Sequence, residues 1–187
     1  MPKDLSDHEV SALLKSVPTG PCWSGRMYLG SMFVLDFGER LLMPRSRGSP
    51  VVCGASTLSV RNCYWEFFSD SQRIADANSA SEEDFASAIL PRLLGASLEA
   101  TSADSYRVQM DIALSNRCRF ALDLTGRWKT EDLLAEFTLQ DGRYVQLPIA
   151  GKFVLSDDME LFRRQQWEVA KSTKRPNTAK NGVNSER

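Results

Sequence analysis

The chain contains a single histidine, His8, among its 187 residues. Histidine is the side chain that most often carries protons at neutral pH, so a Ser-His-Asp or Cys-His site would have to use it. No Gly-x-Ser-x-Gly motif or comparable nucleophile motif accompanies it. We therefore expect His8 to be a surface residue of a helix, and the sequence offers no catalytic residue. This favours a non-enzymatic protein.

The sequence also lacks the usual motifs of metal-binding and nucleotide-binding sites. The four cysteines lie ten or more positions apart, form no Cys-x-x-Cys pair and have no histidine nearby, which is unlike a structural zinc site. The glycines form neither Gly-x-Gly-x-x-Gly nor Gly-Lys-Ser/Thr, and no calcium-loop motif occurs. The acidic runs 82–84 and 157–158 are explained by helix capping. We expect neither a metal nor a cofactor.

The sequence lacks a long apolar run, and its first twenty residues are rich in charge. Both features differ from a membrane span or a signal peptide, so we expect a cytoplasmic protein that does not enter a membrane. In that compartment Cys22, Cys53, Cys63 and Cys118 are expected to be reduced thiols, mostly in the core.

What the chain does have is an average globular composition, with 42% hydrophobic and 25% charged residues. Residues 171–187 carry five basic residues and one acidic residue, Glu186, which gives a net charge of +4. Because the whole chain has a net charge of −1, residues 1–170 have a net charge of −5. We expect a single, mildly acidic domain over residues 1–170. The basic tail, 171–187, has too few apolar side chains to fold and is expected to be disordered.

One pattern occurs twice along the chain. The segment 33–40, Phe-Val-Leu-Asp-Phe-Gly-Glu-Arg, is similar to the segment 120–127, Phe-Ala-Leu-Asp-Leu-Thr-Gly-Arg. Each is followed by a second strand-turn-strand pattern, which begins at Glu66-Phe67 in one case and at Glu136-Phe137 in the other. The pattern predicts two related β units at about 27–76 and 96–150.

Helical spacing of apolar residues and capping residues such as Ser6 and Ser81 predict helices at 7–16, 82–94 and 157–170. Alternation of polar and apolar residues predicts strands within 26–45, with Gly38-Glu39 as a hairpin turn, and at 58–68, 72–75, 96–101, 107–114, 119–124, 134–139 and 144–149. The alternation around Trp65 places this side chain in the core. We therefore expect an α+β fold: mostly antiparallel sheet built from two β units, joined by a helix and flanked by N- and C-terminal helices. Parallel βαβ winding is the alternative.

A few residues are candidates for function. Asp36 and Asp123 occupy matching positions in the two units and could approach each other in a pocket, although an aspartate before a glycine usually orders a turn. Trp23 and Trp128 lie in or near predicted loops, which makes them candidate anchors for a partner. The basic loop with Arg45 and Arg47 could contact a partner or nucleic acid, yet two arginines in a loop are usually solvated.

Trp65, the Ile74-Ala75-Asp76 segment, Leu93-Leu94-Gly95 and the Phe120-x-Leu-Asp-Leu-x-Gly126 pattern resemble small β-rich bacterial proteins of the domain-of-unknown-function kind. Some proteins of that kind are similar to immunity proteins, which neutralise polymorphic toxins. The resemblance implies a cytoplasmic partner-binding protein. The helical ends, the basic tail and Thr125 before the second turn glycine depart from the pattern, so no functional residue is carried over.

The sequence thus favours a non-enzymatic protein whose acidic body binds a protein partner, such as a basic toxin. A second hypothesis is a small-molecule-binding protein or an unusual hydrolase with a pocket between the two β units. A third is a nucleic-acid accessory protein that uses Arg45, Arg47 and the basic tail, although the sequence shows no nucleic-acid-binding module.

Overall fold

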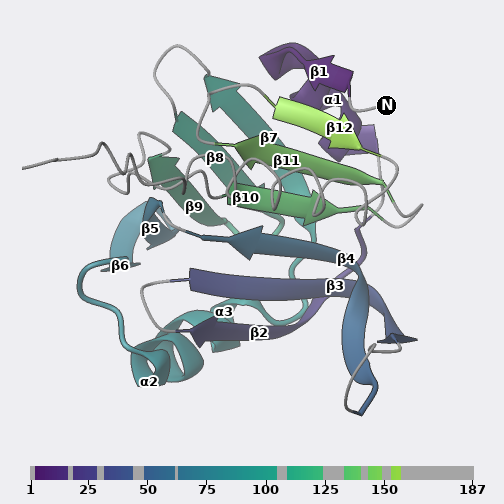
Figure 1. Ribbon diagram of the computed structural model, residues 1–187. Coiled ribbons are helices and arrows are strands. Elements are labelled where there is room, and N and C mark those ends of the chain that lie inside the picture. Colours follow the sequence, from purple (N-terminus) through teal and green to yellow (C-terminus); the bar gives the residue numbers. More distant parts are fainter. Residues whose placement is uncertain are drawn as a thin grey trace, which may run out of the picture.

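The computed structural model describes residues 3–16, 19–28, 32–43, 49–61, 63–104, 109–123, 133–139, 143–148 and 153–156. Most of these residues form two antiparallel sheets (Figure 1). The seven-stranded sheet has the order β1-β12-β11-β10-β4-β3-β2, and the five-stranded sheet has the order β6-β5-β9-β8-β7. The strands of the first are β1 (Lys3–Leu5), β12 (Phe153–Ser156), β11 (Tyr144–Pro148), β10 (Leu133–Thr138), β4 (Val51–Val60), β3 (Met32–Met43) and β2 (Cys22–Tyr28). Those of the second are β6 (Gln72–Asp76), β5 (Tyr64–Ser69), β9 (Cys118–Asp123), β8 (Gln109–Leu114) and β7 (Leu98–Asp104).

Two helical segments flank the sheets. Helix α1 (Asp7–Ser16) begins at the expected capping box, in which the Ser6 backbone N–H donates to the Glu9 carboxylate at 2.9 Å. The second segment consists of α2 (Glu82–Asp84), the π-helical turn η2 (Phe85–Ile89) and α3 (Leu90–Leu93), and it begins at a capping box formed by Ser81 and Asp84. The helix therefore continues through Pro91, and Gly95 follows it with φ +85°.

The expected α+β class is wrong, because the described part of the chain is mostly β. Strands β1 and β12 and the first half of β2 were not expected, and β4 starts before the strand predicted there. The pairing of β1 with β12 depends on contacts between distant parts of the chain, which local patterns do not reveal. Ser156 ends a strand, and the predicted C-terminal helix at 157–170 lies outside the described residues, as does the predicted tail.

The expected hairpin turn at Gly38-Glu39 is also wrong. Strand β3 runs straight through it and pairs with β4 on both sides, with Phe37 opposite Ser56 and Arg40 opposite Gly54. Two residues of β3 therefore face one residue of β4, which is a β-bulge with Gly38 at φ +73°. The same glycine that suggested a turn supplies the left-handed conformation that a bulge needs.

The core lies between the two sheets and is rich in aromatic rings. Phe120 of β9 stacks on Phe33 of β3 with ring centroids 4.8 Å apart and lies 4.9 Å from Phe67 of β5. Trp65, which the alternating pattern places in the core, is fully buried against Phe33 and Phe120. The two sheets therefore pack against each other through one hydrophobic cluster that includes these aromatic rings.

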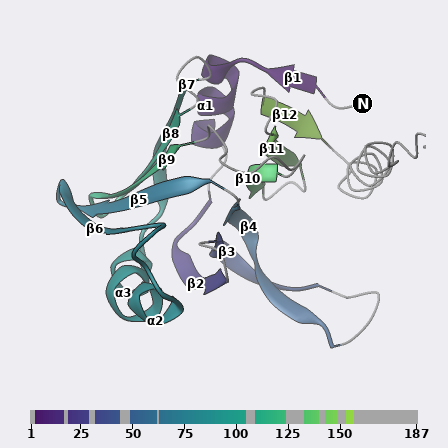
Figure 2. The ribbon, with the colours of Figure 1, turned by 60° about the vertical axis from the view of Figure 1, so that its left-hand side comes forward.

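The two halves of the chain are interleaved rather than side by side. Strands β2–β4 and β10–β12 share one sheet, while β5–β6 and β7–β9 share the other. The two sheets have the same strand order when β2 to β6 are matched in turn with β7 to β11. The order β11-β10-β4-β3-β2 in one sheet then corresponds to β6-β5-β9-β8-β7 in the other. The helices follow the same scheme, since α1 contacts β7 while η2 and α3 contact β2, and the two helical segments lie at opposite ends of the pair of sheets (Figure 2).

Candidate functional site: a hollow on the five-stranded sheet

The candidate carboxylates Asp36 and Asp123 lie in different sheets, on β3 and β9. Asp36 is 1% exposed, and its carboxylate accepts a hydrogen bond from the backbone N–H of Gly54 at 2.9 Å. Arg26 of β2 lies 3.5 Å from its other oxygen. The Asp36 side chain thus connects the neighbouring strands β2, β3 and β4 at the bulge. These contacts stabilise the fold.

Trp23 lies in strand β2 rather than in a loop and is half-buried. The guanidinium of Arg40 covers its ring at 4.6 Å from the centroid. An exposed cation–π contact of this kind contributes about 0.5–1 kcal/mol. One face of the Trp23 indole ring is therefore covered by Arg40 of the same chain. Trp128, Arg45 and Arg47 lie outside the described residues.

Asp123, in contrast, lines a hollow on the five-stranded sheet with a volume of about 350 Å³. Strand β5, from the first predicted unit, and strands β8 and β9, from the second, supply the walls. Asp36 is not among the lining residues. They are Tyr64, Glu66, Phe68, Gln109, Met110, Asp111, Arg119, Ala121, Leu122 and Asp123.

Strand register shows why the surface is hollow there. Ala121 of β9 pairs with Glu66 of β5 on one side and with Asp111 of β8 on the other. Along β9, Asp123 and Arg119 lie two positions away and share its face of the strand. The smallest side chain is therefore surrounded by carboxylates on three sides and by a guanidinium on the fourth.

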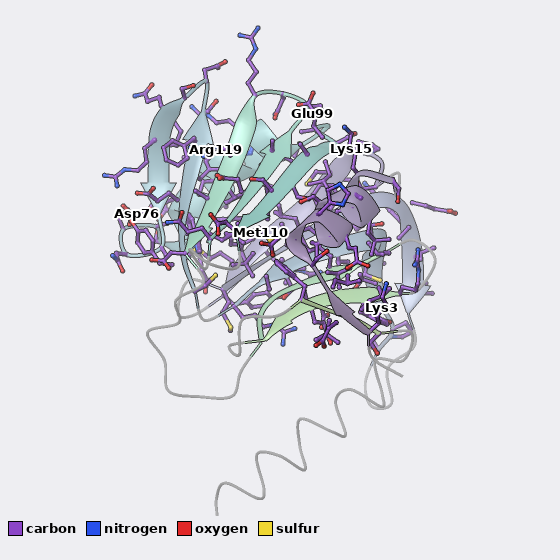
Figure 3. The ribbon with its side chains drawn as sticks, turned by 90° about the horizontal axis from the view of Figure 1, so that it is seen from above. Lys3, Lys15, Asp76, Glu99, Met110 and Arg119 are labelled. Carbon is purple, nitrogen blue, oxygen red and sulfur yellow. The ribbon has the colours of Figure 1, made fainter. Side chains whose placement is uncertain are left out.

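Arg119 is held at the edge of the hollow by two contacts. Its Nη1 lies 2.5 Å from Oδ1 of Asp111, and its guanidinium lies 4.5 Å from the centre of the Phe68 ring. Figure 3 shows Arg119 on the five-stranded sheet, with Asp76 on the edge strand β6, which is separated from β9 by β5. Arg119 therefore supplies the positive charge that balances Asp111 in the structure.

A second ion-pair group lies beside the hollow. Arg73 of β6 donates to Glu66 Oε1 at 2.9 Å and lies 3.8 Å from Asp76. Partial burial, with further contributions from Asp76 and Glu66, raises the pKa of Tyr64, whose hydroxyl donates to Glu66 at 3.4 Å. Together with Asp76, the three lining carboxylates outnumber the guanidiniums of Arg119 and Arg73 by four to two, and this excess of negative charge favours a positively charged ligand.

A second exposed surface is the ribbon formed by the outer halves of β3 and β4, which projects from the body in Figure 2. Its exposed apolar residues are Leu41, Leu42 and Val52, which are 37%, 68% and 46% exposed. On the side away from β4, the described backbone pairing of β3 extends as far as Gly38, whose N–H donates to the Pro21 carbonyl at 3.0 Å. Cys53 also lies on this ribbon and is half-buried.

Sequence analysis identified Asp123 but missed Glu66, Asp111 and Arg119 as its neighbours. Alternation along each strand does place Tyr64, Glu66 and Phe68 on one face. The missing information was the pairing of β5 with β9, two strands about fifty residues apart in the sequence.

The described residues meet the requirements of neither a metal site nor a membrane-spanning helix. Among the described residues, no group of three or more His, Cys, Asp or Glu side chains is arranged to hold a metal ion. No helix in the described ranges is long and apolar enough to cross a membrane.

No protein-family model matches the chain, and no curated protein or solved structure is significantly similar to it. The hollow therefore has to be interpreted from its own residues.

Proposed function

We propose that this protein is a non-enzymatic protein-binding module that binds a basic segment of a partner over the hollow of the five-stranded sheet. The observation that carries this proposal is the group of three carboxylates around Ala121, which together with Asp76 outnumber the neighbouring guanidiniums of Arg119 and Arg73. Opposite charges at such a surface speed association and orient the partner. A partner of the basic-toxin type, for which this chain would act as an immunity protein, has the required charge.

The mixed lining of the hollow suits a peptide better than a small apolar ligand. Tyr64 and Phe68 offer aromatic surface at opposite ends of β5, and Gln109 adds an amide that can donate and accept hydrogen bonds. Aromatic residues beside polar groups are typical of protein interfaces.

The experiment compares two variants with equal charge changes. In the first, Glu66→Gln, Asp111→Asn and Asp123→Asn neutralise the hollow. In the second, Glu82→Gln, Glu83→Gln and Glu99→Gln neutralise three exposed glutamates that do not line it. Each tagged full-length protein is used to capture partners from the native host at low and high salt.

We expect the wild type and the second variant to retain one protein in stoichiometric amount at low salt, and the first variant to lose it. Equal recovery by both variants would overturn the assignment of binding to the hollow. Recovery of nucleic acid alone would support the hypothesis that assigns binding to Arg45, Arg47 and the basic tail.

The small-molecule alternative is supported by one observation, the hollow between strands of the two predicted units. The sequence-based version of this hypothesis required Asp36 and Asp123 in one pocket. Asp36 instead accepts a hydrogen bond from Gly54 in the seven-stranded sheet, whereas Asp123 lies in the five-stranded sheet. A free amine that binds in the hollow without a protein partner would favour it.

A further inference from the structure

A row of mostly polar side chains crosses the seven-stranded sheet on its outer face, the face turned away from the core. Glu136 of β10 pairs with Ser59 of β4 on one side and with Gln146 of β11 on the other. Gln146 in turn pairs with Val154 of β12. Because side chains alternate along a strand and Val145 lies in the core, Gln146 and its row point the other way.

Two polar members of this row are almost completely shielded from solvent. Gln146 is 1% exposed and Ser59 is 6% exposed, although both lie on inner strands of the sheet. The described helices pack against β1, β2, β6 and β7, which are the edge strands of the two sheets. This leaves the cover over Gln146 to be supplied by a further segment.

The side chain of Gln146 also needs a hydrogen-bond donor. Its Nε2 donates to Oε2 of Glu136 at 2.7 Å, but no described residue donates to its buried Oε1. A buried acceptor without a donor is costly, so the covering segment is expected to bring an N–H group. The adjacent Glu136 carboxylate favours a cationic donor, because charge-assisted hydrogen bonds are the stronger ones.

The chain beyond β12 is best placed to supply this donor. It follows directly on Ser156, which pairs with Tyr144 of β11, two positions from Gln146. The connections from β10 to β11 and from β11 to β12 contain only a few residues, too short to run out over the face and return.

The predicted helix 157–170 has the length that this position requires. At 1.5 Å per residue it is about 21 Å long, whereas β12 and β4 are three strand spacings, about 14 Å, apart. Arg163 of this helix lies about 10 Å beyond Ser156, which corresponds to two strand spacings. That distance brings Arg163 to β10, the strand of Glu136.

Arg163 is also the cation on the apolar side of this helix. Met159 and Trp167 lie four positions to either side of it and share its side. Arg164 instead has a glutamate four positions to either side, so it can form ion pairs within the helix and face solvent.

We infer that residues 157–170 dock as a helix across the outer face of the seven-stranded sheet, and that the Arg163 guanidinium donates to Gln146 Oε1 and to the Glu136 carboxylate. This inference goes beyond the proposed function, because it concerns the other sheet and a binding segment of the same chain. The hollow of the five-stranded sheet stays available for a separate partner.

A cross-link of zero length tests the position of Arg163 in the full-length protein. In Arg163→Lys an amine replaces the guanidinium, and a carbodiimide joins an amine to a carboxylate only where the two are in contact. Arg164→Lys is the matched control, because it makes the same change on the other side of the helix. Mass spectrometry identifies the joined residues, and a mixture of isotopically labelled and unlabelled chains shows whether they belong to one chain.

We expect a link between position 163 and Glu136 within one chain, and its loss in Arg164→Lys. A link between Lys129 and Glu136 would assign the cover to residues 124–132. A link between two chains would assign it to a second copy of the protein. Either result would overturn the inference.

A double-mutant cycle measures the same contact without a reagent. Arg163→Gln and Glu136→Gln should each lower the folding equilibrium constant about tenfold in urea denaturation, because a charge-assisted hydrogen bond is lost. The double variant should lose no more than either single variant, since both changes remove one contact, whereas Arg164→Gln and Glu136→Gln should be additive. Additive losses for Arg163 and Glu136 would overturn the inference and leave the proposed function standing.

Discussion

The backbone N–H of Gly54 donates a hydrogen bond to the buried carboxylate of Asp36 at 2.9 Å, across the bulge in strand β3. Gly54 has no room for a side chain, because an added Cβ would lie 2.5 Å from the backbone nitrogen of Phe37. Asp36 therefore satisfies a buried N–H group at a point where the strands leave no room for a side chain. Its role in the structure is to fix the bulge.

Replacing Asp36 with alanine should lower the free energy of unfolding by about 1–3 kcal/mol, because a buried N–H group loses its acceptor. Asp36→Asn should retain most of the stability, since its amide oxygen can still accept from Gly54. Urea denaturation of both variants measures the difference. Equal losses in the two variants would show that the charge of Asp36, and not its hydrogen bond, supports the bulge.

The aromatic cluster makes a second prediction about stability. Phe120 is fully buried and contacts Phe33, Trp65 and Phe67, so Phe120→Ala should cost about 3–5 kcal/mol through lost contacts and a cavity. Phe68→Ala is the control, because Phe68 is half-buried on the opposite face of the five-stranded sheet. Denaturation midpoints should separate the two variants clearly, and similar losses would contradict the assignment of the core.

The sequence predicted local features well and long-range pairing poorly. The bounds of α1, the capping residues Ser6 and Ser81 and the burial of Trp65 follow from residue types within a few positions of each other. Gly38 could be read as a turn or as a bulge, because both use a positive φ and only pairing with β4 decides between them. The hollow required the pairing of β5 with β9, which no local pattern specifies.

Glu9 should make the stability of the protein depend on pH. The backbone N–H of Ser6 and the ammonium of Lys3 stabilise its ionised form and lower its pKa from 4.5 to about 2. A carboxyl group with a lowered pKa stabilises the folded state above its unfolded pKa, and that contribution disappears as the pH falls from 4.5 to about 2.

Glu9→Gln keeps a capping side chain but removes the titration. The difference in melting temperature between the wild type and this variant should therefore shrink over that pH range, as followed by circular dichroism. A difference that stays constant would mean that Glu9 does not stabilise the fold through its charge.

The four cysteines should react with alkylating reagents in a defined order. Burial raises the pKa of Cys22 to about 11 and that of Cys63 to about 12, so neither forms a thiolate readily at neutral pH. Cys53 is the least buried and lies on the projecting ribbon. Iodoacetamide labelling followed by mass spectrometry should modify Cys53 first, and Cys53→Ser should remove the fast phase. A fast phase that persists in this variant would contradict the burial of the other thiols.

Arg119 should oppose the binding of a basic ligand, because it already pairs with Asp111 inside the hollow. Arg119→Gln should strengthen binding of a hexa-arginine peptide several-fold in titration calorimetry, since it frees Asp111 and removes a like charge. Arg117→Gln removes the same charge from a residue that is 84% exposed and pairs with Asp70, away from the lining.

If the effect arises inside the hollow, Arg119→Gln must tighten binding more than Arg117→Gln, and the gap must persist at higher salt, where contributions from distant exposed charges are screened. Equal effects at every salt concentration would mean that the peptide responds only to net charge. Weaker binding by Arg119→Gln would mean that the guanidinium on Phe68 forms part of the binding surface and does not compete with the ligand.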